Sequence, residues 1–334
     1  MTVTEFVERP FAKALVDYAG RNERVVCVTN DLTKSVEADL FRETFPDRYF
    51  SLGMAEQNLA GVLSGLAREG LEPVYPSFSV FATRRPYEQI LLNIAYPNLP
   101  VRLIGFLPGI TTPGGVTHQA NDDVALMRGM PNMTVLSLAD ATDVETLTGV
   151  LAEIDGPVFC RSPRGNVPRL FDDPLRFGHA RRLSSGSDLT VISSGATTEH
   201  SIRACAAIGD AGISVSHLNV STLKPFTDEL VIETLANGAP VITAENHLRS
   251  GGLGTAVAEL IADHGLGARL HRVGIRDTFT HGGRPEYLFA HYEIDDVAIV
   301  NAANELLGSS VQFESTVAGG PRRTTLAASV NEGL

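Results

Sequence analysis

A glutamate lies on the face of a predicted helix that should enter a hydrophobic core. In the segment RYFSLGMAEQNLAGVLSGLAREG, residues 48–70, apolar residues recur with the spacing of an amphipathic helix at Leu59, Val62, Leu63 and Leu66. Glu56 falls on the same face, three residues before Leu59. A buried carboxylate is costly as a lone anion and becomes tolerable when it is protonated or hydrogen-bonded to a ligand. An acid with a raised pKa that awaits a basic nitrogen is a catalytic arrangement.

Glu56 also has a purely structural interpretation. An acid in the first turn of a helix interacts well with the helix dipole and can reach solvent. Three features favour catalysis instead. Glu56 lies on the apolar face, the helix carries Gly61 and Gly65, and it follows a predicted strand end at 50–52. Helix glycines lower stability unless close packing needs them, and ligands of doubly wound folds bind at the carboxyl edge of the sheet.

Four more side chains have chemistry that a site could use, although each has an ordinary structural role when it is considered alone. Phe78 and Phe81 follow a predicted strand, where aromatic residues usually join the core. His118, in the Gly-rich loop GGVTHQ, is either a surface residue or a group that titrates near neutrality in catalysis. Arg161 ends a predicted strand and could bind an anion through its planar donors or form a surface ion pair.

Short β-rich runs alternate with helical patterns along the whole chain. The predicted strands are 25–29, 73–78, 101–106, 134–138, 157–161, 189–193, 215–219, 240–244 and 269–273. The predicted helices are 10–20, 36–45, 55–69, 82–96, 141–154, 196–211, 228–237, 253–265 and 293–307. This alternation predicts βαβ units, mainly parallel sheets and an α/β fold of two doubly wound domains.

Two stretches depart from the alternation. Residues 164–187 are polar, contain prolines and glycines without a clear period, and are expected to link two domains. After residue 309 the chain is rich in Ser, Thr and Gly, which predicts a flexible tail. We therefore expect one domain over 1–170, a second over 185–308 and the tail over 309–334.

Composition narrows the class of protein. The 334 residues are 43% hydrophobic, and the formal net charge is −12, which argues against broad binding of nucleic acid or anionic membranes. No apolar run reaches the length of a membrane span, and the N-terminus lacks a signal-peptide pattern. Cys27, Cys160 and Cys205 show no CxxC spacing, and no histidines pair at metal-ligand spacing. We expect a cytoplasmic protein that builds no metal site of its own.

The order of the motifs resembles a known enzyme family. GMAEQNLAGVLSGLAREG, PVYPSFSVFATRRPYEQI, THQ and PNMTVLSLADATD follow one another as in transketolases and 1-deoxy-D-xylulose-5-phosphate synthases, which are thiamine diphosphate enzymes. The resemblance runs from about residue 10 to 310. It implies a pyrimidine-binding domain followed by the transketolase C-terminal domain.

The resemblance implies roles around the cofactor. The glutamate that matches Glu56 hydrogen-bonds a ring nitrogen of the aminopyrimidine and favours the imino tautomer, which then deprotonates the thiazolium carbon. Phe81 would stack on the pyrimidine with Phe78 at its edge, and His118 would face the substrate near the reacting carbons. Asp31, in NDLTKS, would lie near the cofactor, although it could equally cap a turn.

It also implies a set of contacts to a substrate anion. Arg161 matches the arginine that binds the substrate phosphate, Ser35 matches a second phosphate contact, and Arg84 matches an arginine position of the synthases. Two departures change this set: Gly114 replaces an aspartate that contacts a substrate hydroxyl, and Phe106 replaces a substrate-binding histidine of transketolases. We therefore expect an altered donor or acceptor, with phosphate, sulfonate and carboxylate all open as the anchored anion.

A complete enzyme of this family also needs a diphosphate-binding domain. The signature of that domain is GDG followed by an asparagine, which hold a divalent metal on the cofactor's diphosphate. The chain contains GDAG at 209–212 and no GDG. The resemblance thus implies one half of a split transketolase, with thiamine diphosphate and Mg²⁺ held mainly by a partner subunit that carries the diphosphate domain. The expected assembly is a heterotetramer with two of each subunit, acting on a small sugar.

Several functions compete. The leading hypothesis is transfer of a two-carbon ketol unit from a ketose to an aldose. A β subunit of an oxo-acid dehydrogenase, or a synthase that uses pyruvate, would share the fold and the glutamate, but the THQ and PNM segments are closer to transketolase. A non-catalytic scaffold subunit would not need Glu56 and both phenylalanines. A nicotinamide-dependent dehydrogenase would need G-x-G-x-x-G after the first strand, which is absent.

Overall fold

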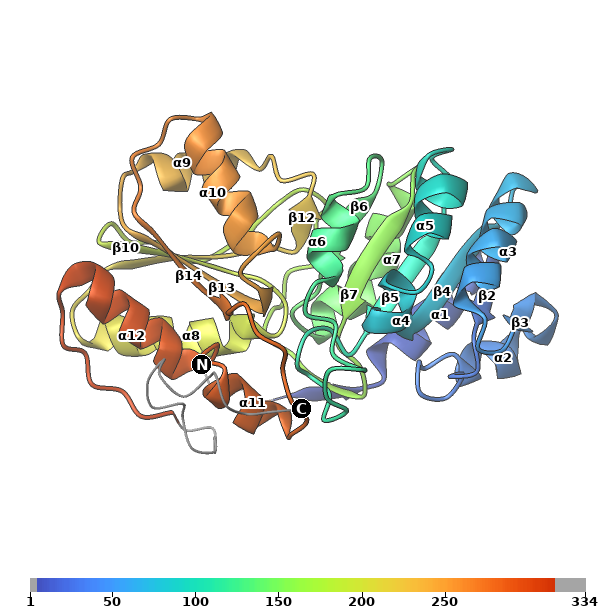
Figure 1. The fold of residues 1–334 in the computed structure, drawn as a ribbon, viewed down its shortest axis with the longest axis horizontal. Coiled ribbons are helices and arrows are strands. Elements are labelled where there is room, and N and C mark those ends of the chain that lie inside the picture. Colours follow the sequence, from blue (N-terminus) through green and yellow to red (C-terminus); the bar gives the residue numbers. More distant parts are fainter. Residues whose placement is uncertain (1–4, 316–334) are drawn as a thin grey trace.

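Two large sheets, each covered by helices, and one small two-stranded sheet lie within residues 5–315, the part of the chain that the computed structural model describes (Figure 1). The first sheet contains β2 (Val25–Thr29), β3 (Tyr49–Ser51), β4 (Glu72–Phe78), β5 (Arg102–Phe106), β6 (Thr134–Ser137), β7 (Val158–Ser162) and β12 (Thr222–Lys224). Their order is β12-β6-β7-β5-β4-β2-β3, and only β12 is antiparallel to its neighbour. The predicted doubly wound α/β architecture is confirmed.

Helices pack on both faces of this first sheet. One hydrophobic cluster joins the strands to α1 (Pro10–Arg21), α2 (Asp39–Thr44) and α7 (Ala141–Ala152). Another joins them to α3 (Glu56–Arg68), the π-helical segment η2 (Leu91–Ala95) and α6 (Asp123–Arg128). Because β2, β4, β5 and β7 are parallel, their carboxyl ends meet at one edge, where a doubly wound fold places its ligands.

The helix predicted over 82–96 is broken into three pieces. α4 (Ser79–Thr83) follows β4 directly, residues 84–86 form a turn, and α5 (Tyr87–Ile90) leads into η2. Pro86 has no amide hydrogen and cannot continue α4, which explains the break. The turn has a consequence for the site, because it carries Arg84 and Arg85 past the end of β4.

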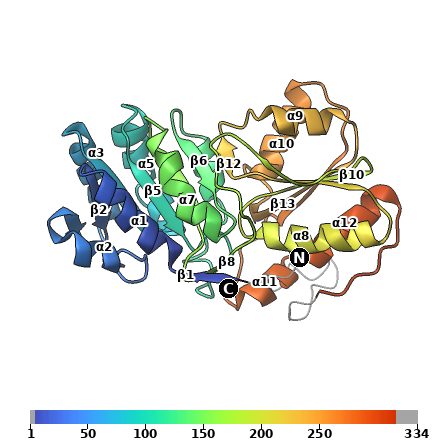
Figure 2. The ribbon, with the colours of Figure 1, turned by 180° about the vertical axis from the view of Figure 1, so that it is seen from behind.

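The second sheet contains β9 (Arg181–Ser184), β10 (Leu189–Ser193), β11 (Val215–Asn219), β13 (Val241–Leu248) and β14 (Leu270–Ile275). Their order is β14-β13-β10-β11-β9, and β9 alone is antiparallel. α9 (Glu229–Ala236) and α10 (Leu253–Asp263) lie on one face, and α8 (Thr197–Asp210), α11 (Pro285–His291) and α12 (Asp296–Leu307) lie on the other (Figures 1 and 2).

The predicted linker over 164–187 contains two strands. β8 (Asn166–Pro168) pairs with β1 (Phe6–Glu8), and β9 pairs with β11. Each strand is three or four residues long and finds its partner far away in the sequence, so local composition does not reveal it. The short helices α6 and α11 were likewise not predicted, because neither is long enough to show a clear period.

The two units share a core. β12 comes from the C-terminal half of the chain but completes the first sheet, and one hydrophobic cluster extends from α3 through β12 to α10. Beyond α12 the chain folds back, so that Asn304 bonds the backbone of Val311 and Ser315 donates to Asp296. The rest of the predicted tail lies outside the described residues. Among the helices described, none is long and apolar enough to cross a bilayer.

Candidate active site

Glu56 begins α3 at the carboxyl edge of the first sheet. Its side chain is only 4% exposed, and it enters the core together with Leu59 and Leu63, as the helical pattern predicts. The carboxylate oxygen Oε1 lies 2.8 Å from Nη1 of Arg85 and 3.4 Å from Nδ2 of Asn30, which follows β2. The sheet edge and the first turn of α3 therefore hold a buried acid at the place where ligands bind.

An aromatic wall stands next to this acid. Phe78 ends β4 and Phe81 lies on α4, so the corner between strand and helix fixes both rings. Their centroids are 6.0 Å apart, and the His118 ring lies 5.4 Å from Phe81 and 6.4 Å from Phe78. The structure thus brings three residues from two separate segments into one cluster.

Arg85 connects the acid to the aromatic wall. Its guanidinium carbon lies 4.1 Å from the centroid of the Phe81 ring, while its Nη1 reaches Glu56. No sequence pattern singles out Arg85 from its neighbour Arg84, because the turn over 84–86 decides which of them points at the acid. Arg84 pairs with Asp122 at 2.7 Å instead, and about a third of each of these two side chains is exposed.

The loop that carries His118 is closely packed on itself. A Cβ at Gly114 would lie 2.9 Å from the Cβ of His118, so no larger residue fits there unless the histidine moves. Thr117 Oγ1 lies 2.9 Å from Nδ1 of the same ring. Gly114, where the resemblance implies an aspartate, therefore leaves the space that His118 occupies. Phe106, the other departure, is buried against Phe11 and stays outside the cluster.

The second unit holds this loop from the other side. The Gln119 side chain donates to the backbone oxygen of His281 at 3.1 Å, and Asn121 donates to Thr280 at 2.7 Å. Both acceptors lie between β14 and α11. The position of His118 thus depends on contacts from the C-terminal part of the chain.

Arg161 lies in β7 and is bound to internal partners. Only 5% of its side chain is exposed. Its Nε lies 3.0 Å from Asp123, and its Nη2 donates to the backbone oxygens of Asn246 and Ala120 at 2.8 and 3.4 Å. These bonds occupy much of the guanidinium that was expected to meet a substrate anion.

Arg164 is a better-placed cation that no motif had singled out. Its Nη1 donates to the backbone oxygen of Ser35 at 2.9 Å, and its guanidinium carbon lies 5.6 Å from the Phe78 ring. Its Nε is buried and has no hydrogen-bond partner among the described residues. Burial lowers the pKa of Arg164, and nearby Glu37 opposes that effect. Arg164 also lines a pocket at this edge, so its guanidinium is a candidate for holding an anionic ligand.

The other two predicted residues lie on the loop after β2. Asp31 and Ser35 are both exposed, and Ser35 joins the cluster through Arg164. A pocket of about 240 Å³ opens nearby between the two units, lined by Arg161, Arg164 and Asn246 among others. Within residues 5–315, no group of three or more His, Cys, Asp or Glu side chains is arranged to hold a metal ion.

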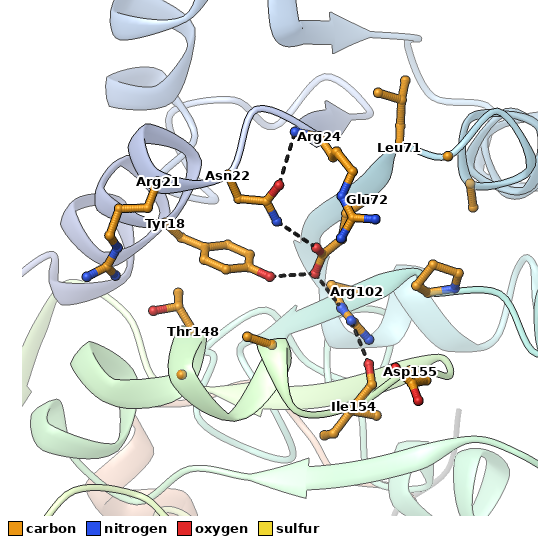
Figure 3. A pocket seen from close by; sticks show the side chains of 15 residues that line it. Tyr18, Arg21, Asn22, Arg24, Leu71, Glu72, Arg102, Thr148, Ile154 and Asp155 are labelled. Atoms are coloured by element: carbon orange, nitrogen blue, oxygen red, sulfur yellow. Dashed lines mark hydrogen bonds and ion pairs between the residues drawn. The ribbon is translucent and has the colours of Figure 1, made fainter.

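A larger cavity, of about 650 Å³, lies at the opposite edge of the sheet, at the amino ends of β2, β4 and β5 (Figure 3). Glu72 points into it and is bound by Tyr18 at 2.7 Å, Asn22 at 3.1 Å and Arg102 at 2.9 Å. Burial and the Glu72 hydrogen bond raise the pKa of Tyr18 to about 12. These polar groups satisfy one another, so the cavity is not a rival to the site around Glu56.

Known proteins match the two halves of the chain in order. Residues 8–169 match the family described as "Transketolase, pyrimidine binding domain", and residues 178–299 match "Transketolase, C-terminal domain". A transketolase family protein of Sinorhizobium fredii is 38% identical over 303 residues, which is 89% of this chain and 88% of that protein. The 6-deoxy-6-sulfo-D-fructose transketolase subunit of a Clostridium species is 35% identical over 299 residues, 89% of this chain and 92% of that subunit.

A solved structure and a longer relative also resemble this chain. A split gene transketolase described as an inactive β4 tetramer has a TM-score of 0.83 and 36% identity, covering 90% of this chain and 97% of that one. The 1-deoxy-D-xylulose-5-phosphate synthase of Gloeobacter violaceus is 34% identical over 286 residues, which is 83% of this chain and 44% of that enzyme. From these matches and the buried Glu56 at the sheet edge, the chain belongs to the transketolase family and contains its pyrimidine-binding and C-terminal domains.

Proposed function

We propose that this chain is the small subunit of a thiamine-diphosphate-dependent transketolase, which transfers a two-carbon ketol unit from a ketose to an aldose. The observation that carries the proposal is the buried Glu56 carboxylate, set at the carboxyl edge of a parallel sheet beside the Phe81 ring. Burial of a carboxylate is energetically unfavourable. A carboxylate that shares a proton with a ring nitrogen of the cofactor would explain why it is buried here.

The residues around Glu56 fit the aminopyrimidine end of the cofactor. Glu56 offers a hydrogen-bond acceptor, and Phe81 offers a ring face for stacking. Asn30 is fully buried, and its Oδ1 has no hydrogen-bond partner among the described residues, which leaves an acceptor for a ring amino group. When bound, thiamine diphosphate supplies the nucleophilic carbon that takes up the ketol unit. Glu56 would hold the proton at a ring nitrogen, and Phe81 with Phe78 would fix the plane of the ring, with Asp31 nearby.

The diphosphate end of the cofactor requires a second polypeptide in this proposal. The outer face of α3 supports it, because Gly61 and Gly65 are exposed and an added Cβ at either position would meet nothing within 4 Å. Two helix glycines lower stability without packing against anything in this chain. We infer that a subunit with the diphosphate-binding domain packs on this face and holds most of the Mg²⁺ ligands. A solved structure described as a split gene transketolase, inactive β4 tetramer, supports the need for another subunit, and the proposed active form is a heterotetramer with two of each.

The substrate is proposed to be a small sugar with an anionic end. Arg164 and Ser35 would anchor the anion, with Arg161, which lines the same pocket as Arg164, and Arg84 as further cations, and His118 would orient a substrate hydroxyl. The Clostridium relative is a 6-deoxy-6-sulfo-D-fructose transketolase subunit, so a sulfonate is a candidate anion together with phosphate. Three free cysteines also support a reducing cytoplasmic location.

The test begins with co-purification of this chain and the diphosphate-domain subunit. Thiamine diphosphate with MgCl₂ is then titrated by calorimetry into the chain alone and into the complex, with Glu56→Ala as the inactive control. Tight binding only in the complex, followed by ketol transfer, is the expected result. Tight binding to the chain alone would contradict the split site. Binding to neither sample would favour a scaffold subunit, and release of carbon dioxide from pyruvate would favour an oxo-acid dehydrogenase or a synthase.

A further inference from the structure

Arg85 already makes both contacts that the proposed function assigns to the aminopyrimidine ring. Its guanidinium lies over the Phe81 ring, with 4.1 Å between the guanidinium carbon and the ring centroid. Its Nη1 lies 2.8 Å from the Glu56 carboxylate. The space between Glu56 and Phe81 is here called the aminopyrimidine seat. A guanidinium is flat, stacks on aromatic faces and has N–H donors along its edge. It therefore resembles an aminopyrimidine in stacking on Phe81 and in donating to Glu56.

The two occupants exclude each other. A ring that stacks on Phe81 and hydrogen-bonds Glu56 needs the volume that the Arg85 guanidinium fills. Arg85 is able to leave, because 49% of its side chain is exposed and Glu56 is its one side-chain hydrogen-bond partner within residues 5–315. It is carried by the turn over 84–86, so a change of side-chain rotamers moves it into solvent without disturbing α4.

In the free subunit, Arg85 compensates the negative charge of the buried Glu56. Glu56 is 4% exposed, and without Arg85 its nearest donor is Asn30 at 3.4 Å, a long hydrogen bond. A buried carboxylate with so little compensation is strongly disfavoured. Arg85 neutralises it and covers the Phe81 face until another flat donor replaces the guanidinium.

We propose that Arg85 is a gate residue that occupies the aminopyrimidine seat between Glu56 and Phe81 and must leave before the cofactor ring binds. The proposal rests on the proposed function, since that function places thiamine diphosphate in this seat. In this proposal Arg85 does not touch the reacting atoms. Arg85 positions Glu56 in the empty site and slows the entry of the ring.

The test measures affinity and association rate for thiamine diphosphate with MgCl₂ in the complex with the diphosphate-domain subunit. Arg85→Ala and Arg85→Gln are expected to bind about three- to tenfold more tightly and to associate faster, because the cofactor ring no longer has to displace a guanidinium that contacts the Phe81 ring and pairs with the buried Glu56. Arg276→Ala is the matched control. The Arg276 side chain is 44% exposed, close to the value for Arg85, and it pairs with Glu293 at 2.8 Å in the second unit, so its removal should leave both values unchanged.

A second measurement separates seat occupancy from a general structural effect. In the Arg85→Ala complex, millimolar guanidinium chloride is expected to compete with the cofactor and return its affinity toward the wild-type value. Equal concentrations of urea, which is flat but neutral, and of NaCl should not compete. A folded Arg85→Ala or Arg85→Gln complex that binds the cofactor with unchanged or lower affinity would overturn the gate. Failure of the wild-type complex to bind thiamine diphosphate would instead overturn the proposed function.

Discussion

The Arg161 guanidinium and the Asp123 carboxylate lie 3.0 Å apart, and at least 95% of each side chain is buried. The pair joins β7 to α6, and Arg161 also bonds the backbone oxygen of Asn246 in β13. An arginine expected to meet substrate is therefore part of the scaffold that connects the two units. The cation with an unpartnered donor at this edge is Arg164.

Asp123→Ala is expected to lower the free energy of unfolding by about 3–5 kcal/mol, because it leaves Arg161 buried without a counter-charge. Asp122→Ala is the matched control, since it removes the adjacent acid from a pair with Arg84 that is about one-third exposed. That change should cost less than about 1 kcal/mol. Urea denaturation of the chain measures both values. Equal losses for the two variants would show that the buried pair contributes no more to the free energy of unfolding than the exposed one.

Arg164→Ala is expected to raise KM for a phosphorylated ketose by about 10- to 100-fold in the complex, because hydrogen bonds to charged groups contribute about 1.5–3 kcal/mol. An uncharged ketose should show little change, since it offers no anion to the Arg164 guanidinium, which lines the pocket. Arg176→Ala, at an exposed arginine, serves as the control. If steady-state kinetics showed equal losses for both ketoses, Arg164 would be structural and the anion site would lie elsewhere.

Gly61→Leu is expected to leave the chain folded and to weaken its association with the diphosphate-domain subunit. The side chain has open space within this chain, and leaving glycine adds up to about 1 kcal/mol of helix stability. Overpacking a contact between subunits costs about 1–3 kcal/mol, which is roughly a tenfold to hundredfold loss of affinity.

Gly149→Leu is the matched control for that experiment. Gly149 is an exposed glycine within α7, and an added Cβ there also meets nothing within 4 Å. Sedimentation of each variant with the partner measures the association. A Gly61→Leu complex as tight as wild type would move the proposed interface away from α3.

His217 is expected to make the fold sensitive to acid. It lies in β11, its Nε2 is 2.9 Å from Ser193 Oγ, and burial lowers its pKa from the usual 6.5 to about 3. Between those values the unfolded chain binds a proton that the native chain does not, so the free energy of unfolding falls as the pH drops below 6.5. Going from pH 7 to pH 5, this one group removes about 2 kcal/mol.

Urea denaturation at the two pH values tests this. His217→Gln keeps a polar group near Ser193 but does not titrate, so its loss of stability on acidification should be smaller than the wild-type loss by about 2 kcal/mol. His264→Gln, at an exposed histidine, should behave as wild type does. The assignment would be wrong if all three proteins lost the same stability.

Local patterns could predict some of the elements around the candidate site because these elements are regular. Glu56 could be placed on the buried face from helix periodicity alone, since that period is a property of consecutive residues. The family resemblance, and no local pattern, assigns Phe78 and Phe81 to the site, and the structure places their rings 6.0 Å apart at the end of β4. The segments that were not predicted are short, such as β8 and β9, and their partners β1 and β11 lie far away in the sequence.

The sequence by itself determined the alternation of strands and helices, the edge at which a site would form and the acid that enters the core there, because each depends on neighbouring residues. Only the tertiary structure decided which partner each arginine side chain contacts. Arg85 points at Glu56 while Arg84 points at Asp122, and Arg161 is taken by Asp123 while Arg164 keeps an unpartnered donor. Partners of a charged side chain are chosen by folding, which brings together groups dozens of residues apart, and no local pattern records that choice.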